Sequence, residues 1–240
     1  MQDIKGKRAF LTGASRGIGQ QIAFGLAELG CHLILQARTE DNLQETLNTL
    51  EAFDIEVDYV TSELSDVNSV KEMLESVDKI GKSVDIVYNC AGSMSQSQDI
   101  YGTERSEWDR IMQINFYAVV SICEHFMPNL VKQGFGRIVN VSSGIANQPA
   151  LAPYSVSKAA VDRYTRDLSK VMKEQKVLMN VVDPGWIKTD MGGPNAFSEV
   201  SSVLPGMLVP VLIDSDGPVS KFYMAQEYVG LELDEIDYSI

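Results

Sequence analysis

The sequence predicts an α/β fold in which a doubly wound sheet of about seven mostly parallel strands is flanked by helices on both faces. Short runs rich in Val, Ile and Leu alternate with longer amphipathic stretches, as expected for buried parallel strands joined by crossover helices. A glycine-rich stretch, TGASRGIG, lies where the first apolar run meets the first amphipathic stretch. Right-handed crossovers then make a doubly wound sheet the economical topology.

The apolar runs place six strands. The six are expected at 7–12, 32–36, 56–62, 85–89, 137–142 and 178–183. The amphipathic stretches predict helices at 17–29, 41–53, 67–79, 106–130 and 154–173.

We expect one domain over residues 1–240, because no linker, repeat or low-complexity segment divides the chain. The proline- and glycine-rich stretch 192–217 interrupts the alternation of strands and helices. A long irregular segment late in a compact domain is often a lid or a substrate loop. We therefore expect a substrate loop at about 190–217, and its apolar residues predict a partly apolar pocket.

The composition narrows the class of partner. A net charge of −13 argues against nucleic acid or an anionic membrane as the main partner. Three scattered cysteines without CxxC spacing fit a reducing compartment. With only two histidines, far apart in sequence, we expect no metal site and no Ser-His-Asp triad. A polar N-terminus and the lack of a long apolar run predict a cytoplasmic protein without a membrane segment.

The glycine-rich turn predicts a site for a pyrophosphate. Gly13 permits a tight turn, while Gly17 and Gly19 let the backbone approach a ligand and let the helix pack on the strand. The helix N-terminus adds free N–H groups and a partial positive charge. The spacing differs from G-x-G-x-x-G and lacks a P-loop lysine, so a plain turn is the alternative on this evidence alone.

The end of the second strand indicates which dinucleotide would bind. An NAD site places an acidic residue there for the ribose 2′-OH, but this chain has Ala37 followed by Arg38. A guanidinium can bind a 2′-phosphate, and Arg16 offers a second cation from the glycine turn. Either arginine alone could be a solvated surface charge. Together with the missing acid they favour NADP(H) over NAD(H).

A tyrosine and a lysine supply a candidate for proton transfer. Tyr154 and Lys158 are spaced i and i+4, on one face of a predicted helix. A nearby ammonium favours the phenolate, whose pKa is ordinarily about 10. Most such pairs are structural, so the spacing by itself is weak evidence. Ser142 and Ser143 follow a buried strand, and Asn115 lies in an apolar helix, where it either bonds within the core or holds a water.

Across nearly the whole chain, these motifs resemble the classical short-chain dehydrogenase/reductase family and its carbonyl-reductase-like members. The matching segments are TGASRGIG, NCAG, the helix Asn115, the serine after IVNV, YSVSK and DPGWIKTDM. The resemblance implies a Rossmann-type fold and a catalytic tetrad of Asn115, Ser143, Tyr154 and Lys158. Tyr154 would be the acid/base and Ser143 would orient the substrate oxygen. Lys158 would lower the tyrosine pKa and hold the nicotinamide ribose, and Asn115 would anchor a water.

The resemblance also implies a set of cofactor-binding residues, in which Glu63 and Leu64 lie by the adenine and the residues after the PG pair hold the nicotinamide. The set is Gly13, Ser15, Arg16, Gly17, Ile18, Gly19, Arg38, Glu63, Leu64, Asn89, Ala91, Gly92, Tyr154, Lys158, Pro184, Gly185, Ile187 and Thr189.

The chain departs from the family pattern in places. Cys90 replaces an asparagine of the NNAG motif, and Glu63 stands where aspartate is usual. The interval between Ser143 and Tyr154 is short, which leaves Ser142 open as the catalytic serine, although the VSS motif favours Ser143. The stretch DSDGPVSKFYM resembles the short last strand and turn of carbonyl-reductase-like members, and the glycine usual there is replaced by Ser220 or Lys221.

The leading hypothesis is an NADP(H)-dependent oxidoreductase, a carbonyl reductase that interconverts a small carbonyl compound and a secondary alcohol. The alternative is a non-catalytic NADP-binding regulator or redox sensor on the same fold. The presence of all four tetrad residues argues against this alternative. Another reaction on this scaffold, such as epimerisation or dehydration, is a third hypothesis. The long helices 106–130 and 154–173 correspond to helices that pair across a twofold axis in the family, which implies a homodimer or homotetramer.

Overall fold

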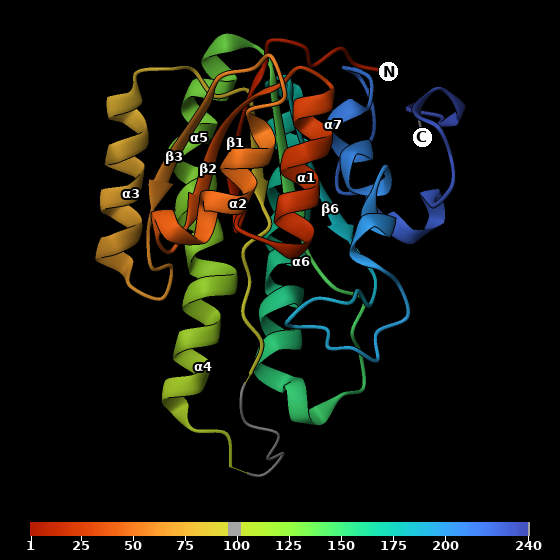
Figure 1. Cartoon of the computed structure of the whole chain (residues 1–240). Helices are drawn as coiled ribbons and strands as arrows, with labels where there is room; N and C mark the ends of the chain where they lie inside the picture. The colour runs from red at the N-terminus through yellow and green to blue at the C-terminus, as the bar shows by residue number, and fades with distance from the viewer. Residues whose placement is uncertain (96–101, 240) are drawn as a thin grey trace.

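One parallel sheet of seven strands forms the centre of the protein, in a computed structural model that describes residues 1–95 and 102–239 (Figure 1). The strand order is β3-β2-β1-β4-β5-β6-β7, and every adjacent pair is parallel. The strands are β1 Arg8–Thr12, β2 His32–Ala37, β3 Val57–Thr61, β4 Ile86–Asn89, β5 Gly136–Val141, β6 Val177–Asp183 and β7 Phe222–Met224. The predicted fold class is confirmed, and the six main strands begin and end within one residue of their predicted positions.

The helices connect the strands as crossovers. They are α1 Gly17–Glu28, α2 Glu40–Leu50, α3 Val67–Ile80, α4 Arg105–Met112, α5 Ala118–Gln133, α6 Ala152–Glu174 and α7 Val209–Leu212. Short 3-10 turns are η2 Pro149–Leu151, η3 Val200–Val203, η4 Gly206–Leu208, η5 Ala225–Tyr228 and η6 Leu233–Glu235. The predicted helix 106–130 is helical throughout, but a π-helical turn, η1 Gln113–Tyr117, separates α4 from α5.

Alternate residues of the strands pack against different helix layers. On β1, Ala9 and Leu11 join the core beneath α1, α2 and α7, while Phe10 joins the core beneath α3 and α5. Strand side chains alternate between the two faces of a sheet, so an all-apolar strand is buried on both. Figure 1 shows α1 and α2 in front of the sheet and α5 behind it.

The strand order reverses between β1 and β4, although the two strands are parallel. The connections from β1 run through β2 to β3 on one side, and those from β4 run through β5 and β6 to β7 on the other. In such sheets ligands bind in the crevice beyond the carboxyl ends of the strands at this switch point. The glycine turn follows β1, and the NCAG segment follows β4, so both lie at the crevice.

The expected substrate loop has two parts. Residues 200–212 form η3, η4 and α7, and Met207 and Leu208 are 0% and 3% exposed within the core under α1. These two residues are therefore core residues and not the pocket-lining ones predicted. Residues 190–199 contain exposed side chains, including Phe197 at 85% exposure, and a substrate role remains a prediction for this part alone.

Ser220 has the backbone conformation expected at the family's glycine position near the last strand. Its φ of +60° lies in the left-handed region that glycine adopts without a steric penalty. Lys221 follows it and donates its backbone N–H to Asn180 Oδ1 at 2.9 Å, at the start of β7.

Candidate active site

The glycine turn requires glycine because backbone segments approach closely there. A Cβ on Gly13 would lie 2.8 Å from Ala91 Cα, and one on Gly19 would lie 2.1 Å from Gly13 O. Gly17 has φ +59°, and a Cβ there would lie 3.2 Å from Thr189 Cγ2. Ser15 and Ile18 are half-buried in the same turn. The turn after β1 is therefore in contact with both the end of β4 and the loop after β6.

Two polar residues that the sequence analysis missed hold this turn in place. Gln36 on β2 is 2% exposed, accepts from Gly13 N at 3.1 Å and donates to Ser62 O at 2.9 Å. Thr46 on α2 is fully buried and donates to Ala14 O at 3.0 Å. A glutamine inside the apolar run LILQA was the available signal, because a buried amide must find partners.

The first turn of α1 has free donors. Arg16 is its N-cap residue and makes no side-chain capping hydrogen bond, whereas α2 and α3 are capped by Thr39 and Asp66. An uncapped helix start leaves backbone N–H groups available to an anion. This arrangement fits the pyrophosphate of a dinucleotide.

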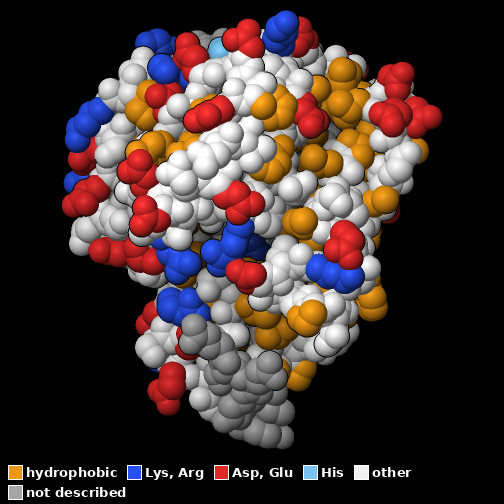
Figure 2. Space-filling model, viewed as in Figure 1, with side chains coloured by type: hydrophobic (Ala, Val, Ile, Leu, Met, Phe, Trp, Pro, Cys, Tyr) orange, Lys and Arg blue, Asp and Glu red, His pale blue; other side chains and the backbone are white. Residues whose placement is uncertain are grey.

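Both candidate arginines for the 2′-phosphate lie at the same edge of the sheet. Arg38 is exposed directly after β2, and Arg16 is 56% exposed. Arg16 Nε forms an ion pair with Asp190 Oδ2 at 2.8 Å, which the sequence did not predict. Figure 2 shows Lys and Arg side chains gathered in the middle of the face turned to the viewer, with acidic side chains beside them.

The residues predicted for the adenine side differ in exposure. Glu63 is exposed and accepts from Ser65 N at 3.0 Å, while the Leu64 side chain is 6% exposed in the core. Asn89 is 2% exposed and donates to Asn140 Oδ1 on β5 at 2.8 Å. The Asn89 amide thus ties β4 to β5, and its cofactor role remains a prediction.

The loop after β6 begins at the PG pair. Pro184 O accepts from Gln226 Nε2 at 3.0 Å, and Gly185 N donates to Asp183 Oδ1 at 2.9 Å. Ile187 is 2% exposed, and Thr189 Oγ1 accepts from Gly192 N at 3.1 Å. The Thr189 hydroxyl therefore supports the bend of this loop where it meets the glycine turn.

Ser143 and Tyr154 meet at the carboxyl end of β5. Burial raises the pKa of Tyr154 to about 12, a hydrogen bond with the Ser143 side chain acts in the opposite direction, and the negative charge of Asp183 adds to burial. Ser142 is 1% exposed and lies by Asp162, whose pKa it lowers against the larger effect of burial. Of the two serines, Ser143 is the one beside the tyrosine.

Lys158 lies behind the tyrosine. Its Nζ donates to Val141 O at 2.8 Å and is 5.8 Å from the centre of the Tyr154 ring. Burial lowers the pKa of Lys158 to about 8, although Cys90, Asp162 and Asp183 raise it. Burial is the largest effect on both groups and shifts the two pKa values in opposite directions, and the lowering of the Tyr154 pKa by Lys158 remains a prediction.

The π-helical turn carries Asn115 into the same cluster. Asn115 is fully buried, accepts from Ser93 N at 2.8 Å and donates to Ser93 O and Ser157 Oγ, each at 2.9 Å. A Cβ on Gly92 would lie 3.5 Å from Lys158 Nζ and 3.6 Å from Asn115 Oδ1. The structure thus brings the four predicted tetrad residues together, from η1, from the loop directly after β5 and from α6.

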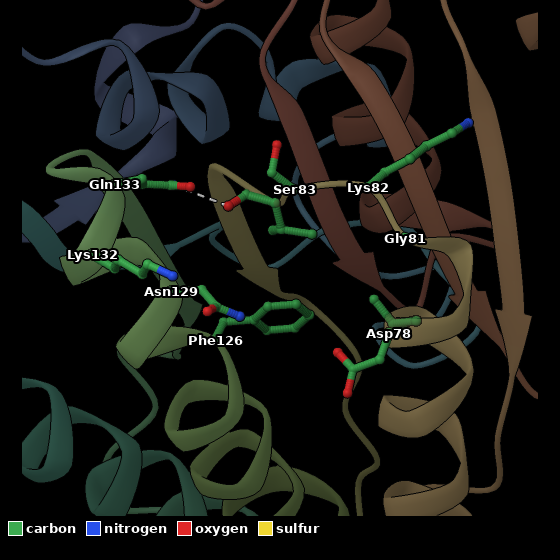
Figure 3. Close-up of a pocket in the computed structure, with 10 residues that line it drawn as sticks. Asp78, Gly81, Lys82, Ser83, Phe126, Asn129, Lys132 and Gln133 are labelled. Atoms are coloured by element: carbon green, nitrogen blue, oxygen red, sulfur yellow. Dashed lines mark hydrogen bonds between the residues drawn. The ribbon is translucent and has the colours of Figure 1, made fainter.

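A pocket of about 460 Å³ lies elsewhere, between the end of α3 and α5. Figure 3 shows Phe126, Asn129 and Asp78 around it, and Gln133 Nε2 donates to Val84 O at 3.1 Å at its edge. It adjoins the amino end of β4, opposite the glycine turn, and contains none of the predicted site residues. Within residues 1–95 and 102–239, no group of His, Cys, Asp and Glu could hold a metal ion. No helix in that part of the chain has the length and apolarity to cross a membrane.

The short chain dehydrogenase family profile matches residues 7–198. The chain belongs to the short-chain dehydrogenase family. It is 30% identical to the 3-oxoacyl-[acyl-carrier-protein] reductase FabG of Thermotoga maritima over 190 residues, covering 78% of this chain and 77% of that protein. It is also 30% identical to a fatty acyl-CoA reductase of Acinetobacter baylyi over 80% of this chain, but that match spans 66% of the relative, just under two thirds.

Solved structures of short-chain dehydrogenases share the fold. The landomycin C-6 ketoreductase LanV, with bound NADP and rabelomycin, superimposes with a TM-score of 0.80 at 25% identity, covering 93% of this chain and 96% of the other. A carveol dehydrogenase from Mycobacterium avium in complex with NAD gives 0.83 at 21% identity, covering 93% and 97%. As a short-chain dehydrogenase, the protein is an oxidoreductase of CH–OH and C=O groups that uses a nicotinamide cofactor.

Proposed function

We propose that this protein is an NADP(H)-dependent carbonyl reductase that interconverts a small carbonyl compound and a secondary alcohol. The observation that carries the proposal is the contact between the Ser143 and Tyr154 side chains, with Lys158 buried behind them. Two hydroxyl groups at one point can both hydrogen-bond a single carbonyl oxygen. A proton donor and an orienting donor are the groups that carbonyl reduction requires of the protein.

The proposed chemistry divides among the tetrad. Bound NADPH would supply the hydride to the carbonyl carbon. Ser143 holds the carbonyl oxygen, and Tyr154 Oη gives that oxygen its proton. A tyrosine whose pKa is raised to about 12 carries that proton at neutral pH, as a donor must. Lys158 holds the nicotinamide ribose and resupplies the proton, and Asn115 anchors a water beside Lys158.

NADP(H) is the proposed cofactor because cations stand where an NAD site has a carboxylate. Arg38 follows β2 directly, and Ala37 occupies the preceding position, buried at 3% exposure. We propose that Arg38 and Arg16 hold the 2′-phosphate, and that the turn 13–19 holds the pyrophosphate. The remaining cofactor residues keep the roles implied by the family.

The environment of the cysteines favours an enzyme over a redox sensor. Burial raises the pKa values of Cys31, Cys90 and Cys123 to about 12 in each case. Reactive cysteines need thiolate character and access to solvent, and Cys31 and Cys123 are fully buried. A thiol-based sensor is therefore poorly supported by these three residues.

The proposal extends to organisation and location. We propose one dinucleotide-binding domain over residues 1–240, with 190–199 beside the substrate, acting in the cytoplasm as a homodimer or homotetramer. Nucleic acid and membrane surfaces are not proposed partners, given the net charge of −13.

The test is a panel of ketones, aldehydes and quinones assayed with NADPH and NADH, on the native chain and on Tyr154→Phe. We expect the native chain to oxidise NADPH with at least one ketone, and Tyr154→Phe to lose this activity while binding NADPH nearly as well. Phenylalanine keeps the packing of the ring and removes only the proton donor. Unchanged turnover in Tyr154→Phe would refute the proposed mechanism.

A further inference from the structure

Asp183 lies at the end of β6, where it connects two loops of the candidate active site. The residue is 8% exposed. Its Oδ2 accepts from Gly144 N at 2.8 Å, and its Oδ1 accepts from Gly185 N at 2.9 Å. One carboxylate therefore binds the residue after Ser143 and the second residue of the PG pair.

The bond between Asp183 and Gly144 continues the pairing of β5 with β6 beyond the last backbone hydrogen bond between these strands. Strands β5 and β6 pair up to Val141 and Val182, and Ser142 N still donates to Val182 O at 2.9 Å. Past that point Gly144 bonds the Asp183 side chain in place of a backbone carbonyl. Ser143 thus lies between two anchored residues, Ser142 on the ladder and Gly144 on the carboxylate.

Gly144 fits this contact for a steric reason. A Cβ at position 144 would lie 2.8 Å from Asp183 Oδ2, closer than side chains tolerate, so any other residue would displace the carboxylate. On the other side, Gln226 Nε2 donates to Pro184 O at 3.0 Å. The PG turn is consequently held from β6 and from the chain after β7.

We propose that Asp183 is a positioning residue of the active site, which fixes the Ser143 turn and the Pro184–Gly185 turn relative to each other. It acts through its hydrogen bonds and does not touch the reacting atoms. The activity part of this inference rests on the proposed role of Ser143 in carbonyl reduction.

The charge of Asp183 also acts on the tetrad. Its negative charge raises the pKa values of Tyr154, Lys158 and Asp162 on α6. Cys90 after β4 also raises the pKa values of Tyr154 and Lys158. Removing that charge lowers the pKa of Tyr154 towards the working range. The alkaline limb of the rate profile then moves to lower pH in Asp183→Asn.

The test compares Asp183→Ala, Asp183→Asn and Gly144→Ala with a matched control, Asp85→Asn. Asp85 lies directly before β4, and its carboxylate likewise accepts from a backbone N–H, that of Arg8 at 3.0 Å, and also from Lys7 Nζ at 3.2 Å. It lies at the amino ends of the strands, away from the candidate active site. We expect kcat to fall roughly 10–100-fold in Asp183→Ala, since small misplacements of reacting groups cost that much. Asp183→Asn keeps one acceptor and recovers part of the loss.

Gly144→Ala disturbs the same hydrogen bond, between Gly144 N and Asp183 Oδ2, from the side of its donor. We expect it to reproduce the loss in kcat, and we expect the double variant Gly144→Ala/Asp183→Ala to be no worse than the poorer single variant, because both remove one contact. Gly144→Ala keeps the Asp183 charge, so it should move the alkaline limb less than Asp183→Asn does. It remains a test even if Asp183→Ala fails to fold.

A second readout needs no substrate. Trp186 follows Gly185, is 48% exposed and donates from Nε1 to Gly192 O at 2.8 Å. In a Trp108→Phe background, we expect acrylamide to quench Trp186 more strongly in Asp183→Ala than in Asp85→Asn. This result would stand even if the native chain reduced no ketone.

The inference is wrong if Asp183→Ala and Asp183→Asn keep kcat within about twofold of the native value, or lose no more than Asp85→Asn. It is also wrong if the Gly144 and Asp183 effects multiply, or if Trp186 quenching is unchanged.

Discussion

Arg16 Nε lies 2.8 Å from Asp190 Oδ2, so the glycine turn after β1 is ion-paired to the loop after β6. The two loops also touch where a Cβ on Gly17 would lie 3.2 Å from Thr189 Cγ2. If Arg16 serves a 2′-phosphate, the phosphate and the Asp190 carboxylate are alternative partners for one guanidinium.

This competition predicts that Asp190→Asn binds NADPH more tightly, by up to about fivefold, since exposed ion pairs are worth little. NADH affinity should not change, because NADH lacks the 2′-phosphate. Isothermal titration measures both. The control is Glu199→Gln, which removes the partner of Lys188 on the same loop and leaves Arg16 untouched. Weaker NADPH binding in Asp190→Asn would contradict the competition.

Arg38→Ala should weaken NADPH binding far more than NADH binding, by about 1.5–3 kcal/mol, if a charged hydrogen bond to the 2′-phosphate is lost. Dissociation constants for the two cofactors give the difference directly. Arg163→Ala is the matched control, because it removes an exposed arginine paired with Asp167 on α6. Equal losses for NADPH and NADH in Arg38→Ala would remove the phosphate role.

Lys158 predicts a pH-dependent stability. Burial lowers its pKa from 10.5 to about 8, so the folded state holds the charged form less favourably than the unfolded state does. The resulting penalty is fully present below pH 8 and disappears as the pH rises towards 10.5. Lys158→Met should therefore gain stability relative to the native chain at pH 7, by at most about 3 kcal/mol, and gain less at pH 9.5.

Urea unfolding of both chains at the two pH values tests this, since other titrating groups cancel in the difference. The lost bond to Val141 O contributes an offset that does not change with pH. A difference between the chains that is the same at pH 7 and 9.5 would contradict the burial effect on Lys158.

Exposed apolar residues on the long helices predict self-association. Val156 and Val171 on α6 are 47% and 59% exposed, and Tyr117 in η1 is 52% exposed. We expect light scattering to give a dimer or tetramer at micromolar concentration, and Val171→Glu to shift it towards smaller species, because a charge would have to be buried. A monodisperse monomer of the native chain would exclude the proposed assembly.

Local patterns predicted most of the fold. The strands could be predicted because each is a short apolar run. The glycine turn could be predicted because its three glycines directly follow a strand. The segment 200–212 was misread because Pro205 and Pro210 hide its periodicity, and its apolar residues suit a core as well as a pocket. The π-helical turn at Asn115 leaves the same sequence pattern as an α-helix, so only the structure shows it.

Long-range contacts explain the rest. Gln36 bonds Gly13 across 23 residues, and Asp183 bonds Gly144 across 39; a polar residue at a strand end does not reveal its partner. The pKa of Tyr154 depends mainly on its burial, to which several elements contribute at once. A Tyr-x-x-x-Lys spacing indicates only that a lysine lies near the tyrosine. The sequence therefore predicted which residues lie together in the candidate active site, but not the long-range hydrogen bonds that hold them in place.

The most direct test of the central claim follows the hydride. The native chain is incubated with a ketone that the substrate panel identifies and with NADPH that carries deuterium at C4. Two labelled forms are used in separate reactions, one with deuterium on each face of the nicotinamide ring. Mass spectrometry of the product should show one deuterium on the carbinol carbon with one of the two forms, and no alcohol with Tyr154→Phe. Alcohol without deuterium from either form, or the same labelled alcohol from Tyr154→Phe, would contradict the account.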